Sequence, residues 1–163
     1  MSAFPLQNGG GKHDHRSCIE EALREAQRLC AERGVRLTEI RRRVLELVWR
    51  SHAPVGAYEL LKELTKERHS AVPPTVYRAL EFLVEQGLVH RIESRNAYVG
   101  CAHPGRSHCS HFLICRACGT AAELPGRRID AAIEETAADC GFLVEGDTVE
   151  VVGLCAHCRG EAD

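Results

Sequence analysis

The chain has 163 residues, of which 44% are hydrophobic and 27% are charged, a balance typical of a soluble globular protein. No apolar run approaches the roughly 18 residues that a membrane helix requires, and residues 1–17 lack the apolar core of a signal peptide. We therefore expect a cytoplasmic protein without a membrane-spanning segment.

The formal net charge of −2 is unevenly distributed along the chain. Residues 1–100 contain 16 Lys and Arg against 13 Asp and Glu, a balance of +3, whereas residues 101–163 contain 5 against 10, a balance of −5. Such asymmetry is expected when a nucleic-acid-binding half is joined to a half with another task. Uneven sampling of ordinary solvated helices would produce it equally well.

Helical periodicity dominates the first half of the chain. Ser17 and Thr38 stand where N-terminal caps are expected. Gly34 and Gly87 are C-terminal stop signals, and Pro54 breaks the second helix. The expected helices are 17–33, 38–52, 57–68 and 75–86.

The hydrophobic period changes after the fourth helix. Strands over 88–92 and 97–101, joined by a turn at 94–96, are predicted to form a β-hairpin. Helices followed by a two-stranded hairpin are the layout of a winged helix-turn-helix domain. The fourth helix would then be the recognition helix and the hairpin would be the wing.

The last third of the chain predicts a smaller mixed unit. Residues 111–115 form a strand that leads through a Cys-x-x-Cys turn into a second strand ending near Leu124. An amphipathic helix over 125–140 and a strand over 148–154 follow, before a second Cys-x-x-Cys. The fold class is therefore α+β. The expected domains are a flexible tail (1–16), a winged-helix DNA-binding domain (17–101), a linker (102–110) and a small α/β domain that carries both Cys-x-x-Cys pairs (111–163).

Two pairs of cysteines have the spacing of a structural zinc site. Cys115 and Cys118 form one pair, and Cys155 and Cys158 form the other. Disulfides are rare in a reducing cytosol, and two such turns supply the four thiolates that tetrahedral zinc prefers. Buried cysteines that merely pack, or a redox pair, are the alternatives. A thioredoxin-like use is disfavoured because neither pair follows a strand and precedes a helix in the expected way.

Three further segments give the chain a resemblance to a known family. They are Arg36-Leu37-Thr38, Pro73-Pro74-Thr75-Val76-Tyr77-Arg78-Ala79-Leu80 and Gly87-Leu88-Val89-His90. Together with the cysteine pairs, these segments resemble the ferric uptake regulator family, and His90 and Cys101 are most similar to its zinc uptake branch. The resemblance implies a zinc-responsive transcriptional repressor that binds an A·T-rich operator as a homodimer, dimerises through its C-terminal domain and controls zinc uptake genes.

By this resemblance, a regulatory metal site maps onto His90, Cys101, His108 and Glu123. The predicted hairpin independently brings His90 and Cys101 together, because they lie on its two strands. A thiolate with imidazoles suits zinc, whereas manganese prefers oxygen ligands. Taken singly, each of these residues could equally be an ordinary surface or packing residue.

Two other histidines leave the metal assignment open. His103 and His111 lie close enough in sequence to replace His108, or they could belong to an extra metal site of the kind that some family members carry. The run of histidines that usually marks such a site is absent here.

The recognition helix presents its candidate DNA-binding residues near its N-terminus, where base edges are usually met. Arg78 can donate two hydrogen bonds to guanine, and Tyr77 can contact a thymine methyl or a phosphate. Thr75 precedes them on the same helix, and Tyr58 resembles a phosphate-contacting position. Further phosphate contacts are expected from Arg36, Arg41, Arg42 and Arg43.

Other classes of protein explain the sequence less well. We expect that the chain is not an enzyme and has no small-molecule substrate. The sequence lacks the His-x-Glu and Pro-Cys-x-x-Cys signature of zinc deaminases, and it shows no nucleophile–base pairing. A constitutive zinc-ribbon adapter would explain the cysteine pairs but not the ligands of the wing. A family relative that senses iron, manganese, nickel or peroxide would share the fold but not the ligand chemistry.

Overall fold

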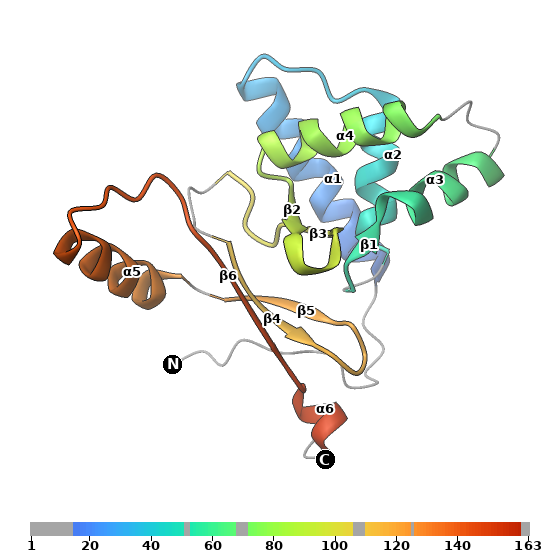
Figure 1. Cartoon of the computed structure of the whole chain (residues 1–163). Helices are drawn as coiled ribbons and strands as arrows, with labels where there is room; N and C mark the ends of the chain where they lie inside the picture. The colour runs from blue at the N-terminus through green and yellow to red at the C-terminus, as the bar shows by residue number, and fades with distance from the viewer. Residues whose placement is uncertain (1–14, 51–52, 68–71, 106–109, 125, 161–163) are drawn as a thin grey trace. The chain divides into compact units, whose positions relative to one another are not determined.

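The computed structural model of the chain describes all residues except 1–14, 51–52, 68–71, 106–109, 125 and 161–163 (Figure 1). The described chain divides into two compact units, one running to Gly105 and one comprising the residues beyond it. Each unit contains one three-stranded sheet together with helices, so the prediction of an α+β fold is confirmed. Among the described helices, none is long and apolar enough to cross a membrane.

Four helices and a short antiparallel sheet make up the N-terminal unit (Figure 1). The elements are α1 (His15–Glu32), α2 (Glu39–Val48), β1 (Val55–Gly56), α3 (Ala57–Lys66), α4 (Pro73–Glu85), β2 (Val89–Ile92), the 3-10 turn η1 (Glu93–Arg95) and β3 (Ala97–Gly100). The strand order is β1-β3-β2, and strand β1 was not expected. Its Val55 lies opposite Tyr98 and its Gly56 opposite Ala97.

The local signals agree with the structure at some helix ends and differ at others. Helix α1 begins at His15, so Ser17 lies inside it rather than capping it, α2 ends at Val48 rather than at 52, and α4 begins at Pro73, two residues before the expected start. Thr38 is the N-cap of α2, and α4 starts with two prolines after the extended residue Val72. Gly34 and Gly87 adopt φ values of +66° and +64°, the left-handed conformation that stops a helix. The tip of the wing turns through Asn96, a non-glycine residue at φ 46°. Helix α3 ends two residues earlier than expected.

The core of the N-terminal unit is formed by apolar faces of all four helices and the wing. Its largest fully buried aliphatic side chains are Val44, Leu45, Val48, Leu60, Leu64, Val76, Leu80, Leu83 and Ile92. These positions recur at intervals of three or four residues within each helix, so one stripe of each helix is buried. The opposite stripe of α4 is consequently left to solvent.

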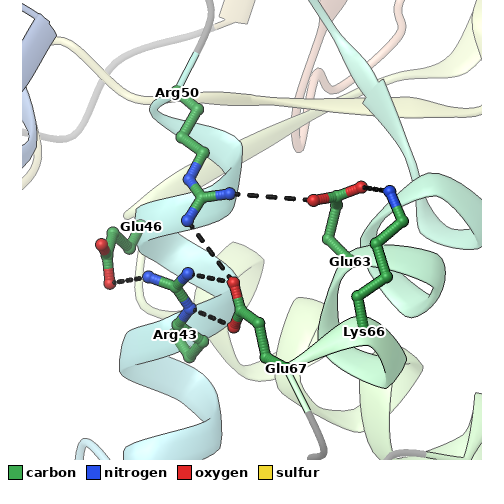
Figure 2. A network of polar contacts seen from close by, with 6 residues as sticks. All are labelled: Arg43, Glu46, Arg50, Glu63, Lys66 and Glu67. Atoms are coloured by element: carbon green, nitrogen blue, oxygen red, sulfur yellow. Dashed lines mark hydrogen bonds and ion pairs between the residues drawn. The ribbon is translucent and has the colours of Figure 1, made fainter.

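A network of six charged side chains links α2 to α3 (Figure 2). Its members are Arg43, Glu46, Arg50, Glu63, Lys66 and Glu67. Arg43 forms a two-pronged ion pair with Glu67 and contacts Glu46 at 2.5 Å. Arg50 lies 3.5 Å from Glu67 and 3.9 Å from Glu63. Arg43, expected to contact phosphate, is therefore engaged by carboxylates, and its guanidinium stays charged because these hydrogen bonds raise its pKa.

The C-terminal unit is a small sheet flanked by two helices. Its elements are β4 (Ser110–Cys115), β5 (Ala121–Leu124), α5 (Arg127–Asp139), β6 (Thr148–Gly153) and the short helix α6 (Ala156–Arg159), which was not expected. Strand β4 lies in the centre, antiparallel to β5 and parallel to β6. No residue of α5 is buried, so the described chain leaves the apolar face of this helix uncovered.

The packing of Gly100 against Trp49 generates a stability prediction. A Cβ atom at Gly100 would lie 2.3 Å from Cε2 of the Trp49 ring, so the ring or strand β3 must shift to admit a methyl group. We expect Gly100→Ala to lower the free energy of unfolding by roughly 1–3 kcal/mol, measured by urea denaturation of the zinc-loaded protein. Gly153→Ala is the control, since a Cβ there meets nothing within 4 Å. Equal stability of the two variants would contradict the prediction.

Candidate metal centres and DNA-binding face

The four predicted zinc cysteines meet at one end of the C-terminal sheet. Cys115 ends β4 and Cys118 lies in the turn that follows, while Cys155 is the N-cap of α6 and Cys158 lies within that helix. The four sulfur atoms all lie within 4.8 Å of one another. The Sγ atoms of Cys118 and Cys155 are 3.8 Å apart, which matches the sulfur–sulfur separation of about 3.8 Å implied by tetrahedral zinc with Zn–S bonds of about 2.3 Å.

Strand pairing explains why cysteine pairs so distant in sequence meet. Parallel strands β4 and β6 place Cys115 opposite Gly153, and the backbone N–H of Arg116 donates to the Gly153 carbonyl at 2.9 Å. Both Cys-x-x-Cys turns therefore leave the sheet at the same end. The second pair starts two residues beyond Gly153, at Cys155.

The protonation of the cluster favours a bound cation. Backbone N–H groups, first that of Cys118 and then that of Cys155, lower the pKa of the Cys115 thiol to about 5. A side-chain hydrogen bond with Thr120 lowers the pKa of Cys118. The hydrogen bond with the Cys155 side chain raises the pKa of Cys158 to about 12. A divalent metal would favour the thiolate form of all four cysteines, because it offsets the repulsion among thiolates.

The wing carries two of the four residues expected to bind the regulatory metal. His90 on β2 pairs with Val99 on β3, and the backbone N–H of Cys101 donates to the Leu88 carbonyl at 3.0 Å. Because opposite residues and every second residue share a face, His90 and Cys101 lie on the same face of the hairpin. A ring nitrogen of His90 lies within 4.8 Å of the Cys101 sulfur, which is 2% exposed. The structure therefore brings the two residues together as the predicted hairpin requires, and their role as metal ligands stays a prediction.

The other expected regulatory ligands belong to a different part of the chain. Glu123 lies on β5 of the C-terminal unit, opposite Phe112 of β4. His108 lies outside the described residues. Of the two histidines that could replace it, His103 is exposed in the loop after β3, whereas His111 is fully buried in β4.

His111 has two carboxylate neighbours that sequence reasoning missed. Its Nε2 lies 2.6 Å from Oδ1 of Asp130 on α5 and 3.6 Å from Oδ2 of Asp147, which precedes β6. One donor atom from each of these three residues lies within 4.8 Å of the other two. Nothing in the local sequence pairs these residues, because the three come from separate elements.

The hydrogen bonds of this cluster bear on whether it fits a metal. Both side-chain oxygens of Asp147 are buried without a hydrogen-bond partner among the described residues, a state that an ion or water would relieve. The backbone N–H of Val149 donates to Nδ1 of His111 at 3.2 Å, which places the proton of a neutral ring on Nε2. A metal held by Nε2 would require that proton on Nδ1 and hence the loss of the Val149 hydrogen bond.

The expected DNA-binding residues occupy the solvent-facing side of α3 and α4. Tyr77 is 47% exposed and Arg78 is also exposed, whereas Thr75 is half-buried in the first turn of α4. Tyr58, in the first turn of α3, is 68% exposed. Arg41 behaves differently, because its guanidinium stacks 3.6 Å from the ring centroid of Phe82.

Known proteins resemble this chain along most of its length. The model of the ferric uptake regulator family matches residues 32–152. The zinc uptake regulation protein of Escherichia coli (strain K12) is 40% identical over 144 residues, which cover 88% of this chain and 84% of that protein. The chain belongs to the ferric uptake regulator family.

Two solved structures of zinc regulators share the fold. A zinc uptake regulator complexed with zinc and DNA matches with a TM-score of 0.83 and 40% identity, covering 87% of this chain and 95% of its own. Holo XcZur matches with a TM-score of 0.79 and 46% identity, covering 86% and 98%. The chain is thus a metal-responsive transcription regulator of the ferric uptake regulator family, and the prediction that it is not an enzyme is confirmed.

The four-cysteine cluster generates a prediction about folding. Cys115→Ser should remove the zinc that resists mild chelation and unfold the C-terminal unit at moderate temperature. The reason is that zinc binding at such sites, about 10–16 kcal/mol in apparent terms, contributes directly to folding. Zinc content after dialysis against a chelator and thermal unfolding followed by circular dichroism provide the measurement. Cys18→Ser, which alters a cysteine of α1, is the control, and retention of as much zinc by Cys115→Ser would contradict the assignment.

Proposed function

We propose that this chain is a zinc-responsive transcriptional repressor that binds operator DNA as a metal-loaded homodimer and controls zinc uptake genes. The observation that carries the proposal is that a ring nitrogen of His90 and the sulfur of Cys101 lie within 4.8 Å of each other on one face of the wing. A thiolate beside an imidazole favours zinc over manganese and, more weakly, over the other metals that this family senses. The similar proteins include zinc uptake regulators, which agrees with that preference.

Two sets of ligands would bind zinc for different purposes, one structural and one regulatory. Cys115, Cys118, Cys155 and Cys158 would hold a structural zinc, and His90, Cys101, His108 and Glu123 would hold a regulatory zinc. Bound at the second set, zinc would supply a common centre for ligands from both units and from the linker over 102–110. Ligation by these residues would then favour the arrangements of the two units that fit an operator. The size of this shift in population would equal the difference in metal-binding free energy between the arrangements.

The C-terminal unit has the surface expected of a dimerisation domain, which we assign to residues 111–163. The uncovered face of α5 lines an apolar groove with its Ile129, Ala132, Ile133 and Ala137. Phe142 and Leu143, just beyond α5, are 68% and 79% exposed. A second copy of the chain would bury these side chains, since exposed apolar patches of this kind mark interaction surfaces. A homodimer also matches the two-fold symmetry of a palindromic operator.

The winged-helix domain, which we assign to residues 17–101, would read the operator through α4. Arg78 would donate to the O6 and N7 atoms of guanine, worth about 1–3 kcal/mol of discrimination. Tyr77 and Thr75 would contact a neighbouring base or phosphate, and Tyr58 would contact the backbone of the DNA. We place this activity in the cytoplasm, where operator DNA and reduced cysteines are both found.

We also propose an extra metal position at His111, which Asp130 and Asp147 would complete. It is supported by the two buried oxygens of Asp147, which accept no hydrogen bond among the described residues, and the metal would have to offset the loss of the Val149 hydrogen bond. His103, the other histidine considered for such a site, is exposed in the N-terminal unit and brings no described carboxylate with it.

The central experiment titrates buffered metal into chelator-treated protein and follows the anisotropy of labelled promoter DNA from zinc uptake genes. Zinc should strengthen binding roughly 5- to 150-fold, the usual range of allosteric coupling, while iron(II) and manganese(II) should not. Cys101→Ser should keep its structural zinc and its fold but lose this response. The Cys18→Ser variant should respond like the wild type.

Three other results would each redirect the proposal. An identical response of Cys101→Ser and the wild type would remove Cys101 from the sensing site. A response to iron or manganese instead of zinc would identify a different metal sensor of the same family. DNA binding or partner binding that ignores every metal would favour a constitutive adapter.

The extra metal position predicts a change in stoichiometry. If it exists, zinc-saturated wild-type protein should bind about one more equivalent of zinc per chain than Asp147→Asn, because the amide is a weaker ligand without charge. Isothermal titration of the chelator-treated proteins would measure the difference. Equal stoichiometry would show that His111 and Asp130 form a structural hydrogen bond instead.

A further inference from the structure

A tyrosine and a lysine contact each other on the exposed side of α3. Tyr58 and Lys62 are separated by one helical turn, and Nζ of Lys62 lies 4.6 Å from the centroid of the Tyr58 ring. This is within the distance at which a cation is attracted to an aromatic face. Both side chains remain exposed in that arrangement, with Tyr58 at 68%. The ring thus holds the ammonium group close to the phenol without shielding it from solvent.

The acidic residues nearest to Lys62 in sequence on α3, Glu59 and Glu63, already have partners. The carboxylate of Glu59 accepts the backbone N–H of Gly56 at 3.2 Å, at the start of the helix. Glu63 lies 2.5 Å from Lys66 and also contacts Arg50 (Figure 2). Lys62 forms no ion pair within the described part of the chain, so its charge is available to an external anion.

Three other basic residues near α2 and α3, namely Arg43, Arg50 and Lys66, are neutralised by carboxylates. Three cations and three carboxylates make up the network between the two helices, and their formal charges cancel (Figure 2). Arg43 and Arg50 point their guanidinium groups at Glu67. The cations of the network are therefore paired with carboxylates, whereas the charge of Lys62 is not compensated by a carboxylate among the described residues.

We propose that Lys62, held over the ring of Tyr58, binds a DNA backbone phosphate together with the Tyr58 hydroxyl. This inference rests on the proposed DNA-binding function and adds a residue to it. A tyrosine hydroxyl and a lysine ammonium are both suited to phosphate oxygens, and such contacts position a protein on the duplex without reading its sequence. Lys62 therefore contributes affinity and salt dependence, whereas Arg78 contributes sequence preference.

The chain itself offers a matched control. Lys62→Gln and Lys66→Gln remove the same charge from the same helix, four residues apart, so long-range electrostatic effects of the two changes are nearly equal. Only Lys62→Gln removes a cation that is free to meet a phosphate. The affinity of the zinc-loaded full chain is measured for an operator duplex and an unrelated duplex at several salt concentrations. Melting temperatures of the variants confirm that each is folded.

We expect Lys62→Gln to weaken binding to both duplexes by the same factor, roughly two- to fivefold at moderate salt. The slope of log affinity against log salt should decrease by about one per bound protomer. Lys66→Gln should leave the slope unchanged, and Lys62→Arg should restore it. Tyr58→Phe should keep the slope of the wild type, because the ring remains, and should weaken both complexes through loss of the hydroxyl.

Other outcomes would overturn this assignment without touching the proposed function. If Lys62→Gln has the wild-type slope, or if Lys66→Gln lowers the slope equally, Lys62 binds no phosphate. A change in the operator-to-unrelated ratio, as expected for Arg78→Ala, would give Lys62 a base contact instead. If the zinc-loaded wild-type protein binds the operator duplex no more tightly than the unrelated duplex, the proposed operator-binding function fails. That failure is seen in the wild type and so is distinct from any effect of the Lys62 variants.

Discussion

Four sulfur atoms confined within 4.8 Å of one another are the constraint on which the C-terminal unit depends. The described residues of this unit bury only His111, Phe112, Ile114 and Cys115, too little apolar area to stabilise a unit of its size. The cysteine cluster compensates because it ties the turn after β4 to the helix after β6. The same sheet carries Glu123 on β5, so a sensing site that uses this carboxylate depends on the structural site for its geometry.

The N-terminal unit is stabilised by a different balance. Its helices bury continuous apolar stripes, and the charges at the junction of α2 and α3 cancel in a compact network (Figure 2). Surface ion pairs of this kind add little stability individually. Their greater effect here is on the distribution of charge, since arginines that could have met phosphate are held by carboxylates. Under the proposed function, contacts with DNA would come from residues outside this network, such as Lys62 on α3 and Arg78 on α4.

The position of the wing explains how a metal site there can influence DNA recognition. Strand β2 begins four residues after the end of α4, and the backbone N–H of Leu88 donates to the Leu83 carbonyl of that helix at 2.9 Å. Leu88 and Val89 are buried in the same core as Leu83. Under the proposed function, a restraint on His90 would reach α4 through packed side chains rather than through a flexible loop.

The sequence by itself determined the features that depend on neighbouring residues. Helical periodicity, the glycine stops and the two prolines that begin α4 predicted the winged-helix layout. The two Cys-x-x-Cys pairs predicted the four-cysteine cluster, because caps, turns and two-residue ligand spacings are local. The strand β1 was missed because two residues carry no period, and α6 because one helical turn resembles a loop. Only the tertiary structure brought Asp130 and Asp147 to His111, turned Arg43 toward Glu67 and placed Lys62 beside acids that were already engaged. The first two arrangements arise from the packing of separate elements, which no sequence spacing encodes. The spacing of Tyr58 and Lys62 allows their contact within α3, but only the tertiary structure shows that the acids beside Lys62 have other partners.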